Sequence, residues 1–396
     1  MADIISDTVR YWRLLWSFRR GYEAVQEEEE VRVKVHVFSL VLAIKLWDKP
    51  HYRKSSYAAD VRDNFRNVAI PGTGIPLSVL ATHKAVAVGF LVFFYPAICL
   101  CAAVAHARRN RTSLSSAYRT QLLAPRDWFS LWRINSRLSA WHSLVTRAPD
   151  YEMENKWSFL EKGLKVGVPV SPILKLEKLC IKHKNEEGGM GIHFFDNALN
   201  GGDWIVQEVM ENSDFVAGLL PRDAPLSTFR VMTASHLDRV DKTSVCDVEA
   251  ISCVFRAGRS GAKTDHSSVL FDVDTKTGVV GRGTANANWY KLGQINVPWG
   301  PPDFAEHPDT GRTITGTKIP NFHENVLRIA TDAHAKMLPR VPLAGWDVVL
   351  SKNHGPCLLE VNLSCNFFRA SFDEPKYFAF VDTYFKFCSS KAGGGE

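Results

Sequence analysis

Short apolar runs rich in β-branched and aromatic residues follow one another beyond Tyr151, separated by turn-forming and amphipathic stretches. Such runs predict β-strands, and the stretch from Asn325 to Met337 predicts a helix. The predicted strands span residues 169–176, 178–183, 204–210, 227–236, 250–258, 268–274, 346–351 and 356–362. The pattern is typical of an α+β domain with a largely antiparallel sheet.

The longest uncharged stretch of the chain lies earlier, over residues 85–104. About 20 apolar residues are what a helix needs to cross a bilayer, so we expect a membrane-spanning helix over 85–105. Basic residues follow it at Arg108, Arg109 and Arg111, which would place the next domain on the cytosolic side. The alternative is a buried hairpin of two short elements broken near Pro96.

The remaining N-terminal patterns are shorter. Residues 31–37 alternate between apolar and polar side chains as a strand does, and an apolar stretch containing Lys45 follows them. Residues 126–147 form one apolar and one basic helical face. A helix of this kind either lies on a membrane surface or packs on its own domain, and packing is the more common case.

Composition narrows the class of protein. Hydrophobic residues make up 45% and charged residues 23% of the chain, which are ordinary values for a folded protein. The net charge of +6 is mild, and no RNA-binding or DNA-binding motif is present, so no nucleic-acid partner is expected. The eight cysteines are scattered without CxxC or Cys/His spacing, so neither zinc nor a disulfide framework is expected.

A lysine and a glycine-rich loop form the first candidate site. Lys182 ends a predicted strand, and the loop after it contains Gly188, Gly189 and Gly191. Glycines let backbone N–H groups approach phosphate oxygens, and the lysine adds a positive charge. The sequence is neither a Walker A loop nor a GxGxxG turn, and an ordinary turn remains the alternative.

The second candidate site is the end of the predicted strand 204–210. Its last residues are Gln207, Glu208, Val209 and Met210. Backbone groups at such a strand end can meet an adenine edge while a carboxylate binds a ribose hydroxyl. The alternative is a strand end without a ligand.

The third candidate site is a predicted hairpin with polar residues among apolar ones. Glu360 and Asn362 are two residues apart on one strand and share a face, and Asp347 lies on the partner strand. Three converging oxygen ligands suit Mg²⁺, whose other positions are filled by water and phosphates. Uncompensated carboxylates between apolar strands are costly, which favours a metal site over the alternative of a polar surface hairpin.

In this order, the three sites resemble those of the ATP-grasp superfamily. Further motifs are similar to the sugar-transfer-associated ATP-grasp group, which is α-L-glutamate ligase-like. The motifs are Asn155–Phe159 before Gly167–Pro169, Ser227–Thr233, His307–Gly311 and Gly345–Asp347. Two departures are His183 after Lys182, where proline is usual, and Asp265-His266-Ser267, where Asp-Asn-Phe is usual.

The resemblance implies two α+β subdomains that clasp ATP, here preceded by an N-terminal helical, membrane-associated region. The expected parts are an N-terminal region of unknown role, the candidate transmembrane helix, a basic amphipathic linker, the ATP-grasp catalytic domain and a disordered tail. Their expected bounds are 1–84, 85–105, 106–150, 151–388 and 389–396.

The resemblance also implies residue roles. Lys182, with Lys156 as a second cation, would contact the ATP phosphates, and Arg230 the γ-phosphate or an acyl phosphate. Arg256 would bind the substrate carboxylate through its planar fork. The adenine side would be held at residues 207–210. Asp347, Glu360 and Asn362 would hold two Mg²⁺ ions, with Mn²⁺ as a substitute.

The expected activity is an ATP-dependent carboxylate–amine ligase that acts through an acyl phosphate on small-molecule or glycan-linked substrates. Asp265 or His307 would deprotonate the amine, and a structural role is the alternative for each. Two other functions fit the same motifs. One is a membrane-anchored, non-catalytic scaffold on an ATP-grasp fold, and the other is a phosphotransferase to a hydroxyl group.

Overall fold

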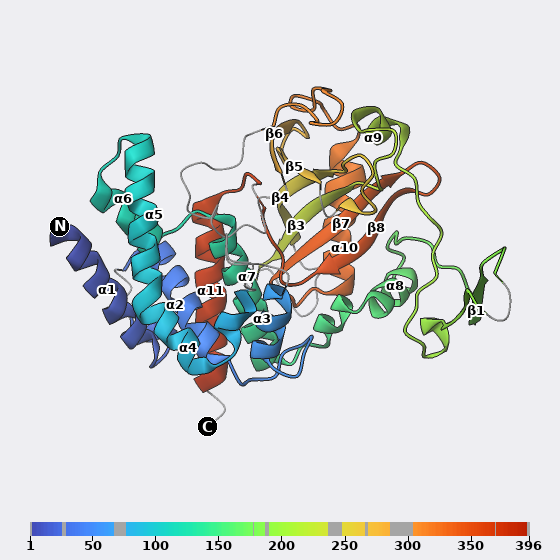
Figure 1. Cartoon of the computed structure of the whole chain (residues 1–396). Coiled ribbons are helices and arrows are strands. Elements are labelled where there is room, and N and C mark those ends of the chain that lie inside the picture. The colour runs from blue at the N-terminus through green and yellow to red at the C-terminus, as the bar shows by residue number, and fades with distance from the viewer. Residues whose placement is uncertain are drawn as a thin grey trace.

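The computed structural model covers the whole chain and combines a helical part with a six-stranded sheet (Figure 1). It describes residues 2–25, 29–66, 77–176, 178–186, 190–236, 248–265, 268–285, 304–368 and 370–393.

The large sheet has the strand order β6-β5-β4-β3-β7-β8, and every neighbouring pair is antiparallel. This confirms the predicted α+β class with an antiparallel sheet. The neighbouring strands β3 and β7 are buried along their whole length. The strands are β3 (Thr228–Ser235), β4 (Val248–Ala257), β5 (Val269–Val273), β6 (Val280–Ala285), β7 (Leu343–Ser351) and β8 (Gly355–Asn362).

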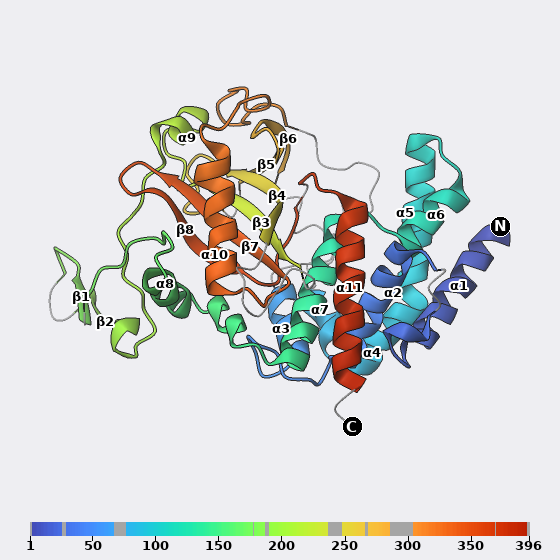
Figure 2. The ribbon, with the colours of Figure 1, turned by 180° about the vertical axis from the view of Figure 1, so that it is seen from behind.

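Helix α10 (Ile329–Met337) covers one face of this sheet (Figure 2). The helix continues a π-helical turn over His323–Arg328 and matches the predicted helix 325–337. Trp346 on β7 is fully buried beneath it, and its indole Nε1 donates to the Thr233 hydroxyl at 2.8 Å. This face of the sheet is therefore filled by packing, which leaves the opposite face for a site.

The helical part combines segments from both ends of the chain. Helix α11 packs with the N-terminal helices in one core, and Figures 1 and 2 both place it beside α7. The helices are α1 (Ala2–Phe18), α2 (Val31–Lys45), α3 (Tyr57–Phe65), α4 (Lys84–Gly89), α5 (Tyr95–Asn110), α6 (Leu114–Leu123), α7 (Trp128–Thr146) and α11 (Glu374–Gly393).

The strand predicted at residues 31–37 is wrong, because this segment begins helix α2. The alternating polar residues do not mark a solvent face. Lys34 and His36 are buried together with the valines between them, since α2 is the central helix of the bundle. The buried ammonium of Lys34 is balanced by Asp382 of α11 at 3.7 Å.

The amphipathic stretch 126–147 forms α7, which packs inside the protein. Asn135 and Ser139 on this helix are fully buried, and their side chains donate to the backbone oxygens of Cys365 and Leu363. Of the two interpretations of this stretch, packing on the protein itself is the one observed. Helix α7 thereby connects the helical part to the chain just after β8.

The uncharged stretch is one helix from Lys84 to Arg108, composed of α4, a π-helical turn at Phe90–Phe94 and α5. The alternative hairpin broken at Pro96 is therefore wrong. Among the described residues this is the one helix long and apolar enough to cross a membrane, which by itself is weak evidence for a span.

Two predicted strands, at 169–176 and 204–210, are not strands of any sheet. They are extended, but they pair at isolated positions, such as Val170 with Leu358 and the N–H of Leu174 with the oxygen of Val206. Between them lies a separate two-stranded sheet of β1 (Lys178–Lys182) and β2 (Ile192–Asp196), most of whose residues are exposed.

Candidate active site

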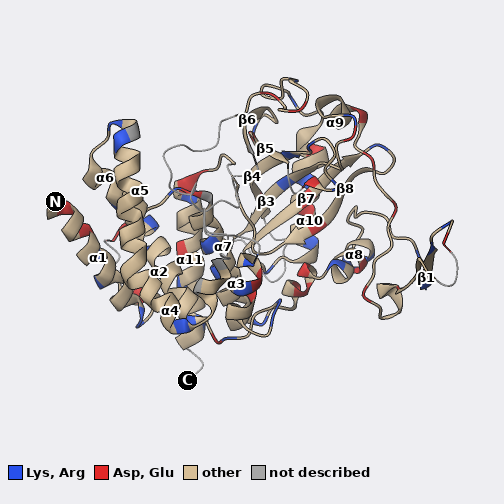
Figure 3. Cartoon of the chain, viewed as in Figure 1, with Lys and Arg blue, Asp and Glu red and all other residues tan. Residues whose placement is uncertain are grey.

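Charged side chains from adjacent strands converge on the sheet face opposite α10. Trp346 points to α10, so its neighbour Asp347 points to the other face. Arg230 on β3 and Glu360 on β8 are the register partners of Asp347, so all three share that face. Figure 3 shows basic and acidic positions on neighbouring strands of the large sheet.

Asp347 binds two arginines at once. Its Oδ1 accepts from Nε of Arg230 at 2.5 Å, and its Oδ2 accepts from Nη2 of Arg230 at 3.0 Å and from Nη1 of Arg256 at 3.2 Å. The chain thus places both arginines assigned from the sequence within one hydrogen-bonded cluster. Bidentate pairing of this kind fixes the orientation of a guanidinium group.

Burial and charge act in opposite directions on this cluster. Burial alone would raise the pKa of Asp347, but the neighbouring charges of Arg230 and Arg256 outweigh it, so the pKa is lowered and Asp347 stays ionised. Burial also lowers the pKa of Arg230, yet Asp347 more than compensates and the pKa is raised.

Arg256 contacts a second carboxylate, that of Asp265. Its Nη2 lies 3.0 Å from Asp265 Oδ1, and the hydroxyl of Thr228 donates to Asp265 Oδ2 at 2.6 Å. Burial raises the pKa of Asp265 despite the arginine. The Nε of Arg256 is buried and has no hydrogen-bond partner within the described residues.

The residues assigned to metal lie together but are engaged by other groups. Glu360 is 3.1 Å from the ammonium of Lys156 and accepts from the amide of Asn362 at 3.3 Å. No cluster of three His, Cys, Asp or Glu ligands occurs in the described part of the chain. The oxygens of Glu360 and Asn362 fit Mg²⁺, whereas both oxygens of Asp347 are held by arginines.

The segment 207–210 lies along the β7–β8 hairpin. The amide of Gln207 donates to the hydroxyl of Ser171 at 2.8 Å, and Glu208 is 3.3 Å from the His354 imidazole in the hairpin turn. Met210 is buried in a small cluster with the hairpin, while Val209 is 88% exposed. The predicted adenine-side residues therefore lie on a connecting segment between the small sheet and the large one.

A family model described as sugar-transfer associated ATP-grasp matches residues 194–368. The match confirms the resemblance to the sugar-transfer-associated ATP-grasp group over these residues, which we call the ATP-grasp region. No curated protein and no solved structure matched the chain. The ATP-grasp region includes all of the large sheet and the clustered residues Arg230, Arg256, Asp347, Glu360 and Asn362.

The lysines and glycines predicted from the sequence to bind phosphate lie outside the matched ATP-grasp segment. Lys182 ends β1, in the small hairpin that stands away from the large sheet in both Figure 1 and Figure 2. Gly191 takes a left-handed conformation (φ +65°) and its backbone oxygen accepts from the N–H of His183, which closes the turn. Gly188 and Gly189 lie outside the described residues.

One largely buried carboxylate beside the candidate active site was missed from the sequence. Glu154 accepts from the backbone N–H of Leu363, the residue after Asn362, at 2.7 Å, and pairs with Arg53 at 3.0 Å. Burial raises the pKa of Glu154. Arg53 belongs to the N-terminal region, about which the family motifs carry no information, so no sequence signal pointed to this contact.

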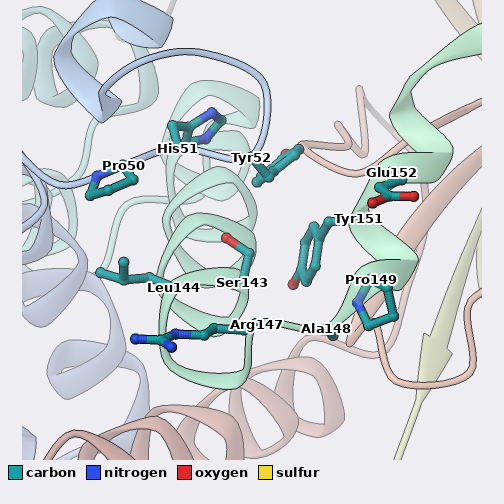
Figure 4. Close-up of a pocket in the computed structure, with 10 residues that line it drawn as sticks. All are labelled: Pro50, His51, Tyr52, Ser143, Leu144, Arg147, Ala148, Pro149, Tyr151 and Glu152. Carbon is teal, nitrogen blue, oxygen red and sulfur yellow. The ribbon is translucent and has the colours of Figure 1, made fainter.

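A pocket of about 540 Å³ is lined by residues that precede the ATP-grasp region in the sequence (Figure 4). Its walls come from the loop after α2, the end of α7 and the turn before α8 (Lys156–Lys165). Tyr52 and Tyr151 lie within it with ring centroids 4.8 Å apart. None of the residues assigned to ATP, metal or substrate lines this pocket.

Proposed function

We propose that the chain is an ATP-dependent carboxylate–amine ligase that activates its acid substrate as an acyl phosphate. The observation that carries this proposal is the cluster in which Asp347 orients Arg230 and Arg256 next to Glu360 and Asn362. Carboxylate activation requires cationic groups for both the acid and the transferring phosphoryl group, and this cluster supplies them side by side.

Each arginine would bind a different anionic group of the reactants. Arg256, whose Nε has no partner within the described residues, would bind the substrate carboxylate, and Arg230 would neutralise the equatorial oxygens of the γ-phosphoryl group. Asp347 would hold both guanidiniums in place throughout. Exposure rises from the buried Arg230 toward Glu360 and Lys156, so the nucleotide would enter from the Lys156 side.

Glu360 and Asn362 would hold the magnesium ions that accompany ATP, and Asp347 remains a proposed third ligand. Bound there, Mg²⁺ would neutralise charge on the β- and γ-phosphates. Lys156, released from Glu360, would bind a phosphate oxygen. Lys182 would join from the small hairpin, and the glycine loop would exclude water from the acyl phosphate.

Asp265 is the better candidate for the base that accepts the proton of the attacking amine. It contacts Arg256 directly, and its raised pKa suits proton transfer. His307 has both ring nitrogens engaged, since Nδ1 accepts from the N–H of Asp309 and Nε2 faces the oxygen of Gly258. We therefore assign His307 a structural role.

The experiment is a turnover assay on the full chain with Mg-ATP, panels of carboxylic acids and amines, and hydroxylamine to trap an acyl phosphate as a hydroxamate. We expect ADP and phosphate release that depends on the acid. Glu360→Gln should abolish it, whereas Glu324→Gln, which removes an exposed carboxylate on the far side of the sheet, should not. Normal turnover by Glu360→Gln would contradict the metal assignment.

One observation favours the alternative of a non-catalytic scaffold on the ATP-grasp fold. Asp347 and Glu360 are each already neutralised by the chain's own cations. A thermal-shift titration with Mg-ATP separates the two functions. The ligase requires a saturable rise in melting temperature that is lost in Glu360→Gln, and the scaffold predicts no rise.

A further inference from the structure

Two exposed apolar stripes lie on neighbouring helices at one end of the molecule. On α1, Ile5, Val9, Trp12 and Trp16 follow one another at helical spacing and are 43–67% exposed. On the Lys84–Arg108 helix, the exposed apolar residues are Val86, Val88, Phe93, Phe94 and Ile98. Exposed aromatic residues in such numbers are unusual on a surface that faces only water.

The two stripes form one continuous surface, because the helices are joined through the π-helical turn. Tyr11 donates its hydroxyl proton to the oxygen of Leu91 at 2.9 Å, and the indole of Trp12 donates to the oxygen of Val92 at 2.9 Å. A π-turn shifts the backbone hydrogen-bond pattern, and here α1 satisfies two of its carbonyls. We call the nine residues named above the apolar face.

The inner side of the same helix is bound to the bundle. Cys99 and Ala103 are fully buried, and Tyr95 lies 3.2 Å from the His36 imidazole of α2. Helix α6 follows α5 and packs on α1 through the Asp7–Arg119 ion pair (3.1 Å). The helix is therefore one wall of a folded bundle and not a separate element.

This packing argues against a simple membrane span. If α5 crossed a bilayer, its partner α6 would enter the hydrocarbon with it. The outer side of α6 carries exposed Ser116 and Thr120 and the guanidinium of Arg119, which is 60% exposed although it pairs with Asp7, and these polar groups would be costly against lipid. The apolar face has no such polar residue within it, so only that face is suited to lipid.

Basic residues border the apolar face. Arg13, Arg19 and Arg20 are exposed on or just after α1, and the guanidinium of Arg19 lies 4.5 Å from the Trp16 ring centre. Arg108 is exposed at the far end of the long helix, and Figure 3 shows this helix without charged positions between its two ends. Apolar residues with tryptophans and a basic border match the headgroup region of an anionic membrane.

We propose that α1 and the Lys84–Arg108 helix form a monotopic docking surface that lies in one leaflet of an anionic membrane without crossing it. The bundle would stay in water and present the large sheet to substrates near the membrane surface. This goes beyond the proposed ligase activity and does not depend on it.

The test uses flotation of the full-length protein with vesicles of phosphatidylcholine alone or mixed with phosphatidylserine. We expect binding to the mixed vesicles. Trp16→Glu and Phe93→Glu should each reduce the partition coefficient at least about tenfold, because each places a charge in the acyl boundary. Leu164→Glu, at an equally exposed leucine on α8, is the matched control and should bind as the unmodified chain does.

Two further measurements decide the mode of binding. Arg13→Gln with Arg20→Gln should remove the preference for phosphatidylserine, and the membrane-bound chain in cells should be extracted by alkaline carbonate. Resistance to carbonate would establish a span and overturn the proposal. If the protein bound no vesicles and formed a dimer that Phe93→Glu dissociates, the proposal would be overturned. The apolar face would then be covered by a second copy of the chain.

Discussion

At the scale of single residues, Asp347 decides how the arginines of the site are arranged. Its carboxylate lies between Arg230 and Arg256, and all three side chains are at least nine-tenths buried. Removing one member of a buried ion cluster leaves the remaining charges without compensation. Asp347 is therefore as much a structural as a functional residue, unlike the half-exposed Glu360.

This difference predicts separate effects on stability. Asp347→Asn should lower the free energy of unfolding by about 3 kcal/mol, the usual cost of an uncompensated buried charge. Glu360→Gln should change it by less than about 1 kcal/mol, since Lys156 is 69% exposed and such pairs contribute little. Urea unfolding of both variants measures this, and equal midpoints would show that Asp347 does not anchor the arginines.

Asp265 gives the activity a predictable pH dependence. Burial raises its pKa, so it becomes an effective base only above the ordinary range of an aspartate, near 3.9. We expect kcat/KM to rise with pH through this raised pKa. The same shift makes the folded state bind the proton more tightly than the unfolded state, so this contribution to stability is present at low pH and lost as pH rises.

A pH–rate profile of Asp265→Asn tests the assignment. The acidic limb should disappear, and the remaining rate should be low at every pH. Asp309→Asn is the control, because Asp309 is an aspartate of the neighbouring loop that pairs with Arg259 outside the arginine cluster. An unchanged acidic limb in Asp265→Asn would assign the base to another group.

The sequence predicted the residue types of the site better than their contacts. Arg230, Arg256 and Asp347 were each given a role, yet their mutual hydrogen bonds join positions 117 and 91 residues apart. Strand order and register determine such contacts, and neither follows from the pattern of one strand. Glu154 was missed for the same reason, since its partner Arg53 lies 101 residues away.

At the scale of elements, the predictions succeeded for most strands of the large sheet and failed for helix α2 and for two extended segments. Strands β3 to β5, β7 and β8 were predicted because short runs of apolar and β-branched residues between turn residues are typical of strands. Residues 31–37 were wrongly predicted as a strand. Residues 33–42 of α2 are all buried, so the helix has no exposed polar face that would give its sequence the helical period of 3.6 residues. Residues 204–210 look like a strand, but they make too few pairings to form one.

In the proposed function, the β1–β2 hairpin contributes Lys182 and the glycine loop to nucleotide binding. A Cβ at Gly191 would lie 2.3 Å from Glu186 Oε2 and 2.8 Å from His183 Cβ, and its φ of +65° is strained for alanine. Gly191→Ala should distort the loop after Lys182 and weaken Mg-ATP binding about tenfold or more, with little effect on overall stability because the hairpin is exposed.

The control for Gly191→Ala is Gly201→Ala. Gly201 also has a positive φ (+82°), but a Cβ there would meet no atom within 4 Å. This variant adds backbone strain near the small sheet without a clash at the loop. Isothermal titration with Mg-ATP compares the two, and equal affinities would mean that the loop conformation does not matter for the nucleotide.

At the scale of the whole molecule, the helical part and the sheet are joined at several places. Tyr384 of α11 donates to the oxygen of Ser235 at the end of β3 at 2.6 Å, and α11 is in turn held within the helical part by Tyr22, which donates to Asp382 at 2.5 Å. Helix α7 holds the segment after β8 because Asn135 and Ser139 donate to the backbone oxygens of Cys365 and Leu363. The helices thus support the strands that carry the candidate active site.

This arrangement predicts that a destabilising substitution in the helical core also destabilises the segments packed against the sheet. Phe38 of α2 packs against Trp141 of α7 and Phe385 of α11, with ring centres 5.3 and 5.1 Å apart. Phe38→Ala should cost about 3–5 kcal/mol, as large-to-small changes in cores do. In hydrogen-exchange measurements, amides of α11 and of the segment 363–366 should then lose protection together, because α7 connects them.

Phe194→Ala, on the exposed side of β2, removes the same ring and should leave both segments protected. Loss of protection confined to α2 would mean instead that the helical part and the ATP-grasp part unfold independently, and that the sheet does not need the helices for its stability.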